Sequence, residues 1–100
     1  MRLYTVQDVE LCGNRIMHFQ RYFIFTTTTL STDDIKSSHK RDPDRFPIIF
    51  KAIGQGAKFP PIVVDRDNKV MDGNTRLSAS TENGAKELTV FKVVGELYTV

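Results

Sequence analysis

The pattern of apolar and polar residues changes period along the chain. Over residues 45–54 the apolar positions recur at helical spacing, which predicts a short helix that packs its apolar stripe on a sheet. Aromatic and β-branched residues fill positions 21–28 and indicate a strand. Two short apolar runs, at 61–65 and 69–72, flank a tight polar turn and predict a β-hairpin. The helical stripe consists of Phe46, Ile49, Phe50 and Ile53.

A helix over 74–83 and a strand over 88–94 are predicted to complete the second half of the chain, with Asn83-Gly84 ending the helix. The first half is less regular. Residues 3–6 are a short strand candidate, and 15–20 are a second one in which alternate side chains share a face. Ser31-Thr32-Asp33-Asp34 offers several N-caps for a short helix or turn, and a polar loop follows. The expected fold class is therefore α+β, with short helices packed on a small mixed sheet.

Length and composition place this pattern in a single domain over residues 1–100. Hydrophobic residues make up 40% of the chain and charged residues 26%, which is typical of globular proteins. Apolar runs are too short to cross a membrane, and the first residues do not resemble a secretory signal, so we expect a soluble cytoplasmic protein without a membrane partner. The one cysteine, Cys12, excludes an internal disulfide and is expected to be a small buried side chain. The formal net charge of +2 decides little about partners.

The turn between the last predicted hairpin strand and the following helix can hold a phosphate. Gly73 allows a positive φ and a close approach to a ligand, and the first N–H groups of the helix have no partner inside it. Arg76 can direct a guanidinium at the same anion, and Asn74 and Thr75 add short polar side chains. Asp72 can carry a magnesium ion or accept a hydroxyl proton. The alternative from spacing alone is an ordinary strand-to-helix turn.

The run from residue 59 to residue 80, followed by Asn83-Gly84-Ala85-Lys86, resembles the ParB/sulfiredoxin-fold family, also known as ParB-like nuclease domains. The resemblance lies in a Pro-Ile-Val-Val strand after a helix that ends at glycine, a hairpin, and then Asp-Gly-x-x-Arg-Leu-x-Ala. It covers about residues 30–94, leaving 1–29 as additional N-terminal strands. Members of this family bind cytidine triphosphate and DNA, repair an oxidised cysteine with ATP, phosphorylate free serine or act as nucleases. The resemblance implies a phosphate site at 73–76.

Departures from the family pattern exclude some of the activities found in this family. Sulfiredoxins need a cysteine two positions before the motif arginine, where this chain has Asn74, so that activity is not expected. ParB partition proteins carry a Glu-Arg pair where this chain has Asn74-Thr75, and they continue into a helix-turn-helix domain and a dimerisation domain. Centromere binding by this chain alone is therefore not expected. The serine-kinase branch keeps the acidic residue, which implies that Asp72 is a catalytic residue and a magnesium ligand.

Relatives also place an arginine from the preceding loop on the nucleotide phosphates. Arg41 is the first candidate for this role and Arg45 the second. The leading hypothesis is a domain that binds a nucleoside triphosphate, ATP or CTP, as a magnesium-dependent phosphotransferase or NTP hydrolase. The alternatives are a DNA-binding or nuclease module and a catalytically silent interaction protein, and a homodimer is compatible with each. Replacing Arg76 by alanine is expected to weaken phosphate binding and to leave folding almost unchanged.

Overall fold

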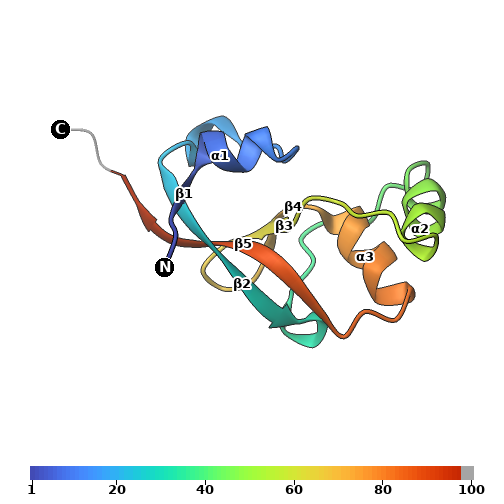
Figure 1. The fold of residues 1–100 in the computed structure, drawn as a ribbon. Helices are drawn as coiled ribbons and strands as arrows, with labels where there is room; N and C mark the ends of the chain where they lie inside the picture. Colours follow the sequence, from blue (N-terminus) through green and yellow to red (C-terminus); the bar gives the residue numbers. More distant parts are fainter. Residues whose placement is uncertain (98–100) are drawn as a thin grey trace.

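A mixed five-stranded sheet forms the centre of the protein, in a computed structural model that describes residues 1–97 (Figure 1). The strand order is β1-β2-β5-β3-β4, in which β3 and β5 run parallel and the other neighbours run antiparallel. The α+β class and the mixed sheet predicted from the sequence are thus confirmed. The strands are β1 (Tyr4–Thr5), β2 (Phe23–Ser31), β3 (Ile62–Val64), β4 (Val70–Asp72) and β5 (Glu87–Glu96).

Helices lie at both ends of the sheet. Figure 1 shows α1 at the C-terminal end of β1 and near the N-terminal end of β2, whereas α3 and α2 lie together at the opposite end. Short 3-10 helices follow α1 and β2. The predicted hairpin is confirmed. The helices predicted over 45–54 and 74–83 are also confirmed, with ends that differ from the prediction by at most one residue. The helices are α1 (Val6–Leu11), α2 (Phe46–Gly54) and α3 (Asn74–Glu82), and the 3-10 helices are η1 (His18–Gln20) and η2 (Thr32–Asp34).

Both faces of the sheet are buried, and alternate residues of one strand serve opposite faces. In β3, Val63 belongs to the core cluster under α1, whereas Ile62 and Val64 belong to the cluster under α3. The strand period of two produces this division, and it explains why β3 reads as an unbroken apolar run. The cluster under α1 contains Val6, Val9, Phe25, Val63, Phe91 and Val93, and the other contains Ile35, Ile62, Val64, Val70, Leu77 and Val90.

The N-terminal third departs from the sequence prediction. The strand predicted over 3–6 stops after Thr5, because this residue caps α1 and forms a capping box with Asp8. The strand predicted over 15–20 is wrong, since its second half is the 3-10 helix η1. Cys12 is exposed at the end of α1 rather than buried.

The apolar stripe of α2 packs on a helix and not on the sheet. Its neighbour is α3, and the side-chain amide of Asn83 donates to the carbonyl of Phe50 at 3.1 Å. The sheet face that α2 was expected to cover is already filled by Leu77 of α3. Among the described residues no helix is long and apolar enough to cross a membrane.

Candidate functional site

The turn from β4 into α3 is made by a single glycine. Gly73 has a φ of +115°, and a Cβ atom added to it would lie 2.5 Å from the Cγ2 of Ile62. Both the backbone conformation and the space therefore require glycine here. The first bond of the helix runs from Leu77 N to Gly73 O at 2.8 Å, and no described side chain caps the N-terminus of α3. The free N–H groups at this end, with the helix dipole, favour an anion.

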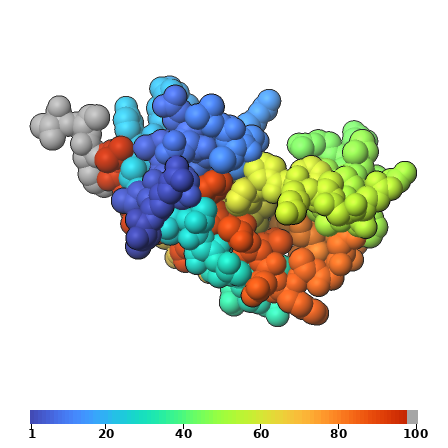
Figure 2. Space-filling view, viewed as in Figure 1, coloured from blue at the N-terminus to red at the C-terminus, as the bar shows by residue number. Residues whose placement is uncertain are grey.

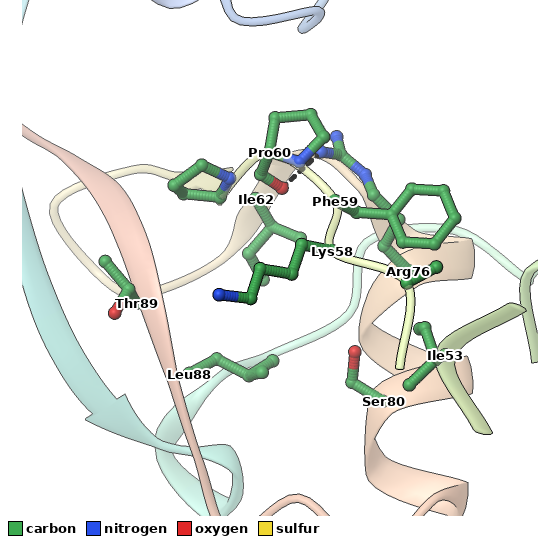
Figure 3. A pocket seen from close by; sticks show the side chains of 11 residues that line it. Ile53, Lys58, Phe59, Pro60, Ile62, Arg76, Ser80, Leu88 and Thr89 are labelled. Carbon is green, nitrogen blue, oxygen red and sulfur yellow. Dashed lines mark hydrogen bonds between the residues drawn. The ribbon is translucent and has the colours of Figure 1, made fainter. Parts of the chain in front are cut away.

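Arg76 joins three separate segments of the chain. Its guanidinium donates to the carbonyl of Pro60 at 2.8 Å, to the Oδ1 of Asn14 at 2.7 Å and to the Oδ2 of Asp72 at 3.3 Å. Only 11% of the side chain is exposed. Figure 3 shows the contact with Pro60 at the rim of a small, mainly apolar pocket of about 280 Å³. Three protein acceptors use most of the guanidinium, so these contacts argue against the expectation that Arg76 matters little for folding.

Asn14 is the partner that local sequence analysis missed. It is 4% exposed, and its side-chain amide donates to the carbonyls of Val9 and Pro61 while its oxygen accepts from Arg76. The sequence indicated only a turn at Gly13-Asn14, because the Pro61 and Arg76 partners lie 47 and 62 positions away. A buried amide with three bonds fixes the N-terminal segment beside the turn.

Asn74 and Thr75 hold the loop that precedes α2. The side-chain oxygen of Asn74 accepts from the backbone N–H of Ser38 at 2.9 Å and from that of His39 at 3.3 Å. The hydroxyl of Thr75 accepts from the N–H of Asp42 at 2.9 Å. Both side chains that the sequence assigned to a phosphate therefore contact protein backbone, and they fix the loop against the start of α3.

These contacts leave a cavity of about 780 Å³ between the N-terminal segment, the loop and α3, which we call the basic cavity. Figure 2 shows the hollow between the blue N-terminal segment and the green loop and α2 region. Four Lys or Arg side chains line it against two aspartates, and three of the four cations are exposed. The charged lining residues are Arg15, Lys40, Arg45, Arg76, Asp42 and Asp72.

The charge of this cavity is positive near the turn. Burial lowers the pKa of Arg76; Asp72 opposes this effect and the nearby charge of Arg45 adds to it. Arg45 and Arg76 line the same cavity, so their like charges oppose each other. The Oδ2 of Asp72 already accepts from Arg76 and from the backbone N–H of Arg15 at 2.8 Å. An anion in the cavity would relieve the remaining repulsion.

Arg41 and Arg45 occupy different places. Arg45 lines the basic cavity beside Gly73 and Arg76. Arg41 instead pairs with Glu82, donates to the hydroxyl of Ser78 at 3.1 Å, and lies outside the set of residues that line the basic cavity. The structure thus brings the second candidate of the sequence analysis to the turn, and not the first.

A magnesium ion held by the protein alone does not fit these residues. One oxygen of Asp72 is committed to two donors, and four cationic side chains surround the cavity. Among residues 1–97 no group of three His, Cys, Asp or Glu side chains could hold a metal ion. Magnesium would enter this site together with nucleotide phosphates, which supply the other oxygens.

Solved structures share this architecture. The chain has the fold of a ParB N-domain. It aligns with the structure of the C2221 form of a Pnob8-like ParB-N domain at a TM-score of 0.62 and 21% identity, over 72% of this chain and 31% of that one. A pNOB8-like ParB N-domain aligns at a TM-score of 0.52 and 24% identity, over 69% of this chain and 27% of that one.

The match covers 31% and 27% of the length of these two solved chains. No protein-family model matches the sequence, and no curated protein matches it. The two solved ParB N-domains confirm the family resemblance found in the sequence at the level of the fold.

Proposed function

We propose that this ParB-like domain is a nucleotide-binding module that holds the phosphates of ATP or CTP in the basic cavity. The observation that carries the proposal is the convergence of an uncapped helix N-terminus with Arg15, Lys40 and Arg45. The volume of about 780 Å³ lies within the range of small-molecule sites. The phosphates would accept from the first N–H groups of α3 and from these three side chains.

Arg76 and Asp72 have a positioning role in this proposal. Arg76 is occupied by three protein acceptors, and Asp72 holds Arg76 and the backbone of Arg15. Magnesium enters with the nucleotide rather than on a preformed protein site. The proposal ends at binding, because the Oδ2 of Asp72 already accepts from Arg76 and from the backbone of Arg15, which gives this residue a positioning role.

Binding can be measured by calorimetry and by protection of Cys12, which is exposed and lines the same cavity. ATP, CTP, their monophosphates and inorganic triphosphate are titrated with and without magnesium, and the alkylation rate of Cys12 is followed. We expect a triphosphate to bind more tightly than a monophosphate and to slow alkylation. Failure of all of these ligands to bind would overturn the proposal.

Two arginine variants provide matched controls. Arg45→Ala removes a charged contact worth about 1.5–3 kcal/mol, or roughly ten- to hundred-fold in affinity. Arg41→Ala removes the same side chain outside the cavity and should leave affinity unchanged. An equal loss of nucleotide affinity in both variants would contradict binding in the basic cavity. Binding of duplex DNA that weakens steeply with salt, without nucleotide binding, would favour the DNA-binding alternative.

A further inference from the structure

We propose that two copies of this chain associate through β2, by antiparallel pairing of the segment Thr27–Ser31. β2 is nine residues long, but the outermost strand β1 pairs only with Ile24 and Phe25. Beyond them, the hydroxyl of Thr26 donates to the carbonyl of Arg2 at 3.3 Å. Among residues 1–97 no strand pairs with the outer side of Thr27–Ser31, which we call the free edge.

The free edge lacks the features that normally block strand pairing. It contains neither a charged residue nor a proline, and the irregularity in β2 lies earlier, between Ile24 and Phe25. Soluble proteins usually protect an exposed edge with charges, prolines or bulges, or cover it with another element. In Figure 1 this half of β2 runs along the lower border of the molecule, and in Figure 2 it reaches the surface. A regular, uncharged edge, three of whose five residues are β-branched threonines, is therefore available to another strand.

The charges at the two ends of the free edge favour a second copy in antiparallel orientation. Asp33 and Asp34 follow the edge and are exposed. At its other end the carbonyl of the exposed Arg2 accepts from Thr26, and the guanidinium of Arg2 lies over the ring of Tyr4, which pairs with Phe25 of β2. Antiparallel pairing around a two-fold axis would bring the acidic end of each copy to the basic end of the other. Parallel pairing would bring like charges together. In the antiparallel arrangement both copies use the same surface, as a two-fold interface requires.

The length of the free edge determines how tightly the two copies are expected to bind each other. Five residues span about 17 Å of strand. Pairing of one strand buries less than the roughly 1,200–2,000 Å² of a stable interface, so we expect a reversible dimer. Its dissociation constant should lie in the micromolar range or above. The basic cavity lies at the N-terminal end of α3, whereas Ser31 of β2 pairs with Glu87, beyond the C-terminal end of α3. We therefore expect the association not to depend on nucleotide.

Sedimentation velocity over a wide concentration range tests the dimer, with a pair of matched variants. Thr29 is exposed on the free edge and lies directly opposite the exposed Thr89 of β5. Thr29→Lys places like charges near each other across the two-fold axis and should weaken the dimer about ten-fold or more. Thr89→Lys adds the same charge on the same sheet face, one strand further in, and should have little effect. Circular dichroism checks that both variants fold.

Charge reversal gives an independent test that does not alter the strand. Arg2→Glu and Asp34→Arg should each weaken the dimer, and the double variant should restore it. The proposal is overturned if the protein is monomeric up to millimolar concentration. Equal effects of Thr29→Lys and Thr89→Lys, or no recovery in the double charge reversal, would likewise exclude the antiparallel edge.

Discussion

Replacing Arg76 with alanine removes the side chain that connects the start of α3 to two other parts of the chain. The wild-type guanidinium bonds to the carbonyl of Pro60, the buried amide oxygen of Asn14 and the carboxylate of Asp72. Alanine leaves these acceptors without that donor. Because Asn14 is 4% exposed, water has little access to its oxygen. The expected result is a loss of stability, in addition to any loss of nucleotide affinity.

The size of this loss follows from the three contacts. A buried acceptor left without a donor costs about 1–3 kcal/mol. Asp72 is 30% exposed and recovers part of its solvation from water, so its contribution is smaller. Lost packing of the Arg76 stem adds to the total. We therefore expect the free energy of unfolding to fall by about 2–4 kcal/mol. At roughly 4–8 °C per kcal/mol for a domain of this size, the Tm should drop by roughly 8–32 °C.

Thermal and urea unfolding followed by circular dichroism measure this effect. Arg41→Ala is the control, since its ion pair with Glu82 is exposed and should contribute about 0–1 kcal/mol. Arg76→Lys keeps the positive charge but cannot reproduce the planar set of donors, so its Tm should lie between those of alanine and arginine. A Tm of Arg76→Ala within about 2 °C of the wild type would refute the structural role derived from these contacts.

Two further predictions concern the turn and the N-terminal cap. Gly73→Ala should destabilise the fold more than the control Gly84→Ala. Both glycines have a positive φ, which costs alanine about 1–2 kcal/mol, but only at Gly73 does the new methyl group meet Ile62, which adds about 1–3 kcal/mol. Denaturant unfolding of the two variants measures this difference in the free energy of unfolding. Bonds from the backbone and the hydroxyl of Thr5 lower the pKa of Asp8 below its ordinary 3.8. A lowered folded-state pKa stabilises above the unfolded-state value, so the advantage of wild type over Asp8→Asn should be complete above pH 3.8 and decrease as the pH falls below it in thermal melts. An advantage independent of pH would contradict this assignment.

The second half of the fold could be predicted because its elements are encoded locally. The stripe from Phe46 to Ile53 has helical spacing, and Gly73 marks the end of β4 whatever lies around it. The N-terminal third could not be predicted in the same way. There the side chains of Thr5 and Asp8 begin a helix of six residues, too short to show a clear apolar period. The mistake on α2 has another cause: an apolar stripe predicts burial but does not say whether a sheet or a helix covers it.

The candidate site could be predicted in part, for the same physical reason. The glycine turn and the helix N-terminus are adjacent in sequence, so the Asp-Gly-x-x-Arg spacing locates them. Arg15 and Asn14 come from a segment about sixty residues earlier, and the pairing of Asn14 with Arg76 exists only after folding. The choice between Arg41 and Arg45 likewise depends on Glu82, which attracts Arg41 to the far part of α3.

The division of roles within the site bears on how one fold can serve different ligands. The residues of the motif mainly contact the protein: Arg76 joins three segments, and Asn74 and Thr75 hold the preceding loop. In the basic cavity the exposed cations come instead from outside the motif, at Arg15, Lys40 and Arg45. If the cavity binds an anion as proposed, substitutions at these positions should change which anion binds without disturbing the turn. Motif variants, by contrast, should alter stability and binding together, so ligand preference in this fold should follow the loops and not the motif.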